Sequence, residues 1–488
     1  MSGTLLAIAV LQVLTILAGL ARAKGLALLL GPAAFGVVST IDQVVVTVVT
    51  LGALGVPFTA LKFLARAHSA GPTAFQRSGA GFLRLMTLLG LVSAGIATAV
   101  ITWRPDTFGA ALAAHRHALA IGIFGVPSAM LLMLFVNAFA AARRPIEAAG
   151  INLLAVTALA VAAVAGAWWR GVDGVYELGL LAAVLTTGLG LVHLARVLAL
   201  RFDTPDAGVV GALRGDPAII GYSLCFYATF AGIAVMMLLA RTTVLSVLGA
   251  ADVGRLQAAF SIALTVGAAL YPLSNLYLGP LVNSHGPVAE KARAVDEFVN
   301  RLLLLLLVGA LPALLFPETL IRILFSAEFA PAAGVLWTFV LWQCVFQIAY
   351  VYQQLLIGLD DIVFAAGALI LGCVVAIALT SPLTRAMGLG GVAVSLAVGM
   401  LLWGVLVAVR LGVKHATWSS PRLVARLTIV LLIVAASGYG FARGSELSVR
   451  GVLARVATAG AVALFCLFSL DARERDPRRW IAALRPGS

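Results

Sequence analysis

Basic side chains stand inside apolar stretches of this chain, where they could bind an anion. Arg22 and Lys24 lie within the long apolar run from Thr4 to Leu30, and Arg241 lies near the end of another run. A charged side chain at such a depth is costly unless it faces water or a partner, so it is a functional candidate. Arginine offers a two-pronged donor and lysine a point charge, and both suit phosphate or pyrophosphate. Alternatively, these side chains extend to the lipid headgroups and only anchor their helices.

Asp42 is the one acidic residue well inside an apolar run. It could pair with one of the basic residues, bind a coupling proton or cation, or lie at a helix end with access to water. Lys62 and Arg84 flank the same region, and Arg84 is about one turn into its own apolar run. Both could guide an anionic substrate, or they could be the ordinary positive charge of a cytoplasmic surface.

Two further groups of residues are candidates for binding and for movement. Tyr271 and Asn275 could present a hydroxyl and an amide to a sugar, or they could serve as interfacial and interhelical contacts. Glycine and proline loosen helices, and a hinge is therefore expected at Gly31, Pro57 and Pro272, although static kinks are the alternative.

The elements that position these residues are membrane-spanning helices. Of the 488 residues, 62% are hydrophobic and 11% are charged, whereas a soluble domain carries about 25% charged residues. The net charge of +13 is spread between apolar runs, which argues against a nucleic-acid partner. A span needs about 20 apolar residues, and this criterion predicts an all-α polytopic membrane protein with about 14 transmembrane helices. The predicted spans are Thr4–Leu30, Phe35–Leu61, Ala80–Thr102, Leu119–Ala141, Ile151–Trp169, Leu178–Leu200, Ala218–Leu239, Leu256–Val282, Leu302–Phe325, Val335–Leu356, Val363–Thr384, Gly391–Val409, Leu423–Gly440 and Val452–Leu470.

An internal repeat organises the spans. The stretch Gly31-Pro-Ala-Ala-Phe-Gly36 corresponds to Gly249-Ala-Ala-Asp-Val-Gly254, and Lys24 falls on Arg241 at an offset of 217 residues. Matched points are an even number of spans apart, which predicts parallel six-helix lobes. We expect an N-lobe at 1–203, a C-lobe at 204–414, and two extra helices with a basic tail at 415–488. The loops on the side of the termini carry most of the Lys and Arg, so both termini are expected to be cytoplasmic.

Signals of catalysis are missing from the sequence. It contains no phosphate-binding loop of the GxxxxGK[ST] type and no HExxH helix. The four cysteines lie in apolar runs without metal-ligand spacing. We therefore expect a protein that is not an enzyme and that needs no cofactor or metal.

Three stretches together resemble the Wzx-type polysaccharide flippases of the multidrug/oligosaccharidyl-lipid/polysaccharide exporter (MOP) superfamily. They are LLLGPAAFG at Leu28–Gly36, GVPFTALKFLAR at Gly55–Arg66 and LFSAEFAPAAGVLWTFVLWQ at Leu324–Gln343. The resemblance covers nearly the whole chain in layout. It implies a multi-pass protein of the bacterial inner membrane that moves undecaprenyl-pyrophosphate-linked oligosaccharide repeat units for O-antigen or exopolysaccharide biosynthesis. The implied partners are this lipid-linked oligosaccharide and the bilayer, and a pairing with a polysaccharide polymerase and co-polymerase stays open.

In the resembling flippases a basic cavity lies between the lobes, and Arg22, Lys24 and Arg241 match it by position and charge. Relatives often carry arginine shortly before the Gly-Pro pair, where this chain has Leu28. A lipid II flippase and a cation-coupled multidrug exporter are the alternative functions. A polymerase or ligase of the same pathway would need a large loop that this sequence lacks.

Overall fold

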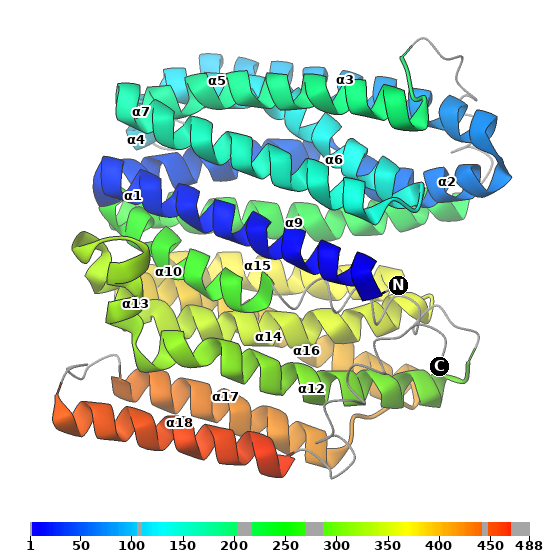
Figure 1. The fold of residues 1–488 in the computed structure, drawn as a ribbon. Coiled ribbons are helices and arrows are strands. Elements are labelled where there is room, and N and C mark those ends of the chain that lie inside the picture. Colours follow the sequence, from blue (N-terminus) through cyan, green and yellow to red (C-terminus); the bar gives the residue numbers. More distant parts are fainter. Residues whose placement is uncertain (1, 105–109, 203–216, 269–285, 442–447, 470–488) are drawn as a thin grey trace. The chain divides into compact units, whose positions relative to one another are not determined.

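The computed structural model describes all residues except 1, 105–109, 203–216, 269–285, 442–447 and 470–488. The described part is built from helices and contains no strand (Figure 1). Ten of its helices are long and apolar enough to cross a membrane. The predicted all-α, multi-pass architecture is therefore confirmed.

Two of these ten helices each contain a pair of predicted spans joined at a kink. They are Ala7–Gly52 and Pro145–Leu198, and the backbone leaves the helical conformation at Gly31 in the first and at Gly171 in the second. The predicted eighth and fourteenth spans begin in helices α10 (Ala250–Ala268) and α18 (Val449–Ser469). The total of about 14 spans is consistent with this arrangement.

The chain forms two compact units, and the first contains Met1–Gln257 together with Leu324–Glu328 and Ile377–Val392. Within it, α7 packs against α1, α5 and α6, while α6 also packs against α2 and α3. Its helices are α1 (Ser2–Gly52), α2 (Val56–Ala70), α3 (Pro72–Trp103), α4 (Ala110–Ala113), α5 (Arg116–Phe124), α6 (Val126–Ala141), α7 (Pro145–Leu198), α9 (Pro217–Val247) and the start of α10.

Helix α1 folds back on itself at the predicted Gly31-Pro32 break (Figure 1, dark blue to blue). Twenty residues of straight helix would separate Arg22 from Asp42 by about 30 Å, yet their side chains lie 2.8 Å apart. Gly31 permits the reversal because its φ of 68° lies in the left-handed region. Pro32 then begins the second arm, where its missing N–H costs no helical hydrogen bond.

Two predicted spans differ from the observed helices at proline residues. The second span was expected to continue to Leu61, but α1 ends at Gly52 and α2 begins at Val56. Pro57 therefore lies in the first turn of a new helix, where proline is well tolerated. The predicted ninth span Leu302–Phe325 is likewise divided, because α12 ends at Leu315, two residues before a proline that opens α13.

The second unit contains Ala258–Ile323, Phe329–Ala376 and Ala393–Ser488. In it, α12 packs against α14, α17 and α18. The side chain of Arg455 on α18 is 1% exposed and donates from Nε to the carbonyl oxygen of Leu315 at 2.5 Å. It thereby caps the C-terminal end of α12, where a cation is favourable. The helices are α12 (Val288–Leu315), α13 (Pro317–Leu324), α14 (Ala333–Gly358), α15 (Ile362–Met387), α16 (Leu389–His415), α17 (Pro421–Phe441) and α18, with a 3₁₀ helix at Ala327–Ala332.

The internal repeat is visible in the backbone. At three places, residues with positive φ recur 217 positions apart with nearly the same angle. A positive φ is uncommon for any residue but glycine, so three matched pairs indicate two copies of one backbone plan. The pairs are Arg143 and Asp360 (58° and 59°), Gly171 and Gly388 (62° and 59°), and Ala199 and Ala416 (52° and 52°).

The two repeats also touch through matched glycines, which we call the glycine seam (Gly36 with Ala250, and Gly254 with Pro32). A Cβ at Gly36 would overlap the carbonyl oxygen of Ala250, and a Cβ at Gly254 would overlap the carbonyl oxygen of Pro32. Each contact is the counterpart of the other under the repeat. Small residues let helix backbones approach closely within membranes, so the seam explains both glycines.

Candidate functional site

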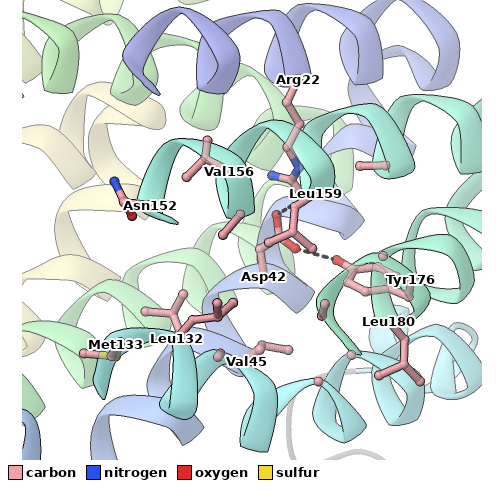
Figure 2. A pocket seen from close by; sticks show the side chains of 18 of the residues that line it. Arg22, Asp42, Val45, Leu132, Met133, Asn152, Val156, Leu159, Tyr176 and Leu180 are labelled. Carbon is pink, nitrogen blue, oxygen red and sulfur yellow. Dashed lines mark hydrogen bonds and ion pairs between the residues drawn. The ribbon is translucent and has the colours of Figure 1, made fainter. Parts of the chain in front are cut away.

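A cavity of about 730 Å³ lies in the first unit, between α1, α5, α6 and α7 (Figure 2). Most of its lining is apolar and includes Val45, Leu132, Met133, Val156 and Leu159. Five side chains bring polar chemistry to this surface: Arg22, Asp42, Asn137, Asn152 and Tyr176.

Arg22 and Asp42 form an ion pair in the cavity, with Nη2 and Oδ2 2.8 Å apart. The hairpin at Gly31 brings them together, because the two residues lie at similar distances on either side of it. Their side chains are 31% and 33% exposed, so both remain in contact with the cavity space. The pair gives a mainly apolar cavity one cation and one anion.

Tyr176 contacts the same carboxylate from α7 (Figure 2). Its hydroxyl oxygen lies 3.0 Å from Oδ1 of Asp42 and 2.9 Å from the carbonyl oxygen of Val38. The Tyr176 side chain is only 7% exposed, so it is held firmly against α1. The second arm of α7, which follows the kink at Gly171, places it there.

The two asparagines face the cavity from different helices. Asn137 on α6 donates from Nδ2 to the carbonyl oxygen of Pro57 at 3.2 Å, which joins α6 to the start of α2. Asn152 on α7 also lines the cavity (Figure 2). Both amides supply donors and acceptors of the kind that recognise hydroxyl groups.

Arg241 is not part of the cavity lining. Its side chain is 7% exposed. The guanidinium donates from Nη1 to Oε1 of Gln43 and from Nη2 to Oε1 of Gln257, at 2.7 Å each. Arg241 therefore joins α9 to α1 and α10, and it experiences the charge of Asp42.

The other predicted site residues lie elsewhere. Lys24 and Lys62 are exposed and do not line the cavity. Arg84 is exposed and donates to the carbonyl oxygen of Phe202 from Nε at 3.0 Å and from Nη2 at 2.6 Å. Gly31 is the reversal point of α1, and Pro57 lines the cavity. Tyr271, Pro272 and Asn275 lie outside the described residues.

Sequence reasoning missed Tyr176 and Asn152. The predicted sixth span begins at Leu178, which left Tyr176 in a loop, whereas α7 continues through it. Asn152 is the second residue of the predicted fifth span and was not singled out. The usable signal in the sequence was Gly171 between two apolar runs, because a helical hairpin that turns there places Tyr176 in the second helix.

A metal site is not evident in the part of the chain that the structure describes. Within it, no three His, Cys, Asp or Glu side chains come close enough to hold an ion together. The arrangement in the cavity is instead suited to binding an organic ligand, with an apolar surface and a few fixed polar groups.

No family model matches the chain, and no curated protein matches it. Several solved structures resemble its fold. The lipid II flippase MurJ in an inward closed conformation aligns with a TM-score of 0.69 and 11% identity, over 94% of this chain and 97% of the other. A multidrug resistance MATE family transporter of the MOP superfamily, in an inward-facing conformation, aligns with a TM-score of 0.61 and 14% identity, over 88% of this chain and 98% of the other. A MOP superfamily transporter from Pyrococcus furiosus aligns with a TM-score of 0.60 and 14% identity, over 88% of this chain and 96% of the other. The chain thus has the fold of the MOP superfamily transporters.

Proposed function

We propose that this protein is a flippase that moves undecaprenyl-pyrophosphate-linked oligosaccharide repeat units across the bacterial inner membrane, for surface polysaccharide or exopolysaccharide biosynthesis. The observation that carries the proposal is Arg22, a cation with access to a mainly apolar cavity. MurJ, whose fold the chain resembles, is a lipid II flippase.

The size of the cavity suits the head of such a substrate. Sites for small organic ligands have volumes of about 300–1,000 Å³, and this cavity has about 730 Å³. A whole lipid-linked oligosaccharide is larger, so the cavity would hold the pyrophosphate and its nearest sugar. The apolar lining would accommodate the first part of the polyprenyl chain.

Each polar residue then has a role in the proposal. The guanidinium of Arg22 binds a phosphate oxygen pair through its two-pronged donor geometry. Asn137 and Asn152 bind sugar hydroxyls. Lys62 and Arg84, both exposed, attract the head group before it enters, and the hinge at Gly31 lets the two arms of α1 move. Both termini lie in the cytoplasm in this scheme.

Arg22→Ala tests the proposal in a strain that lacks the chromosomal gene. We expect the variant to reach the membrane, to lose surface polysaccharide and to accumulate lipid-linked repeat units. Arg22→Lys keeps the charge and should restore part of the export. Arg116→Ala removes an equally positive but exposed side chain outside the cavity and serves as the matched control. Normal polysaccharide in the Arg22→Ala strain would refute the role of the cavity.

A cation-coupled multidrug exporter is the second candidate, because Asp42 places an acid in the cavity. A deletion strain with normal polysaccharide and new drug sensitivity would favour it. A lethal deletion with accumulation of lipid II would favour a lipid II flippase instead. A viable deletion strain without polysaccharide supports the leading proposal.

A further inference from the structure

Asp42, Arg22 and Tyr176 together have the geometry of a proton-linked anion site. We propose that Asp42 takes up a proton when an anionic head group binds to Arg22, and that Tyr176 turns its O–H from Asp42 to the carbonyl of Val38 as this happens. The inference rests on the proposed function, because it takes the ligand to be a pyrophosphate. It adds the regulation of binding by pH.

The hydroxyl of Tyr176 is the first step of the argument. It has one proton but two acceptors within reach, Oδ1 of Asp42 at 3.0 Å and the carbonyl oxygen of Val38 at 2.9 Å. When Asp42 is ionised, Tyr176 donates to it. When Asp42 is protonated, its new O–H donates to the tyrosine oxygen, and Tyr176 donates to Val38. Every polar group therefore remains hydrogen-bonded in both protonation states.

Arg22 is the second step, because its availability changes with the charge of Asp42. In the ionised state the carboxylate lies 2.8 Å from the guanidinium and occupies the position that an anion would take. Protonation removes that competing charge. The guanidinium, which is 31% exposed to the cavity, can then bind a phosphate without a second negative group beside it.

The charges that face Asp42 explain why the proton and the anion bind together. Arg22 faces it from the first arm of α1, Tyr176 from α7, and Arg241 acts on it from α9. The cavity-lining residues of α5 and α6 include no titratable side chain. Without a ligand, the carboxylate balances the charge of Arg22. A bound pyrophosphate adds negative charge, which favours the protonated form.

The sign of the pH dependence follows from this reciprocity. Proton binding strengthens anion binding, so the affinity for the anion should fall as the pH rises. Uptake of one proton per ligand corresponds to a tenfold rise in Kd per pH unit. Asp42→Asn imitates the protonated side chain, because the amide can donate to Tyr176 and carries no charge.

The experiment measures binding of farnesyl pyrophosphate to the purified full-length protein in detergent between pH 5.5 and 8.5. We expect the Kd of the wild type to rise with pH more steeply than that of Asp42→Asn, by up to tenfold per unit. The ionisation of the probe itself is common to both proteins and cancels in the comparison. Infrared difference spectra should show a protonated carboxyl band on binding that Asp42→Asn lacks and that Tyr176→Phe shifts, because the phenyl ring offers no acceptor.

Each outcome decides the question. Equal pH slopes in wild type and Asp42→Asn, without a carboxyl band, would overturn the proton linkage while leaving head-group binding intact. No binding of the probe at any pH would overturn the proposed function and this inference with it. If Asp42→Asn cannot be purified, the wild type and Tyr176→Phe are compared instead. A carboxyl band that appears on binding and shifts in Tyr176→Phe supports the proton linkage, and the absence of such a band overturns it.

Discussion

At the scale of single residues, the protein stabilises its buried cations in two different ways. Arg22 pairs with a carboxylate and keeps access to the cavity, whereas Arg241 is surrounded by two glutamine oxygens and is 7% exposed. A cation held by neutral amides has no acidic hydrogen-bond partner whose protonation could change its contacts. A cation beside an acid can be released when that acid is neutralised. Under the proposed function, Arg22 is therefore the cation that can reach a ligand in the cavity, while Arg241 joins α9 to α1 and α10.

Asp361, just before α15, allows a pH prediction outside the membrane spans. A hydrogen bond from Arg410 at 2.7 Å lowers the pKa of Asp361 to about 2, compared with about 3.9 in an unfolded chain. The contact therefore stabilises the fold above about pH 4, and the stabilisation is lost as the pH falls toward 2. We expect Asp361→Asn to lower Tm at pH 6, with a difference from wild type that shrinks between pH 4 and 2. A constant difference across that range would contradict the role of the ionised carboxylate.

At the scale of elements, two helical hairpins bring the polar residues of the cavity together. The reversal at Gly31 brings Arg22 to Asp42, and the one at Gly171 brings Tyr176 to the same carboxylate. Neither arm alone could form the site. The glycine seam lets the tip of the α1 hairpin pack closely against the start of α10.

The glycine seam gives a prediction about stability. Gly36→Ala places a methyl group against the carbonyl oxygen of Ala250, and overpacking of this kind costs about 1–3 kcal/mol. Gly95→Ala is the matched control, because Gly95 lies in α3 with nothing within 4 Å of an added Cβ. It should instead stabilise by about 0.4–1 kcal/mol. Thermal unfolding in detergent measures both, and a Gly36→Ala protein as stable as Gly95→Ala would show that the seam adapts.

At the scale of the whole molecule, the two repeats share strained backbone conformations at matched positions. Ala199 follows α7 and Ala416 follows α16, and both are exposed with a φ of 52°. A left-handed conformation costs an alanine about 1–2 kcal/mol that glycine avoids. Ala199→Gly and Ala416→Gly should therefore each raise Tm by a similar amount, and the double variant should add the two gains. Ala195→Gly, inside α7, should lower Tm, because glycine costs about 1 kcal/mol of stability relative to alanine in a helix interior. Opposite effects at Ala199 and Ala416 would contradict a shared backbone plan.

Sequence reasoning predicted the helices and the repeat because hydrophobic length and glycine positions determine them. The break at Gly31 was predicted from its Gly-Pro pair, and a basic partner for Asp42 was one of the alternatives that the sequence left open. The choice of Arg22 over Lys24 could not be predicted, because it depends on the rotation of the first arm about its axis. Tyr176 was missed for a related reason, since a hairpin whose tip contains Arg170 and Glu177 reads as a loop in a hydropathy profile.

The reciprocal contacts of the glycine seam have a consequence for ancestry. Gly36 meets Ala250 and Gly254 meets Pro32, so one pair of ancestral positions occurs twice. Such self-complementary contact is what a twofold-symmetric dimer makes through a single patch. A gene that encoded one repeat could have assembled through this patch before duplication joined the two copies. Once fused, the copies were free to diverge, and an Arg–Asp pair could evolve in one of them without being imposed on the other.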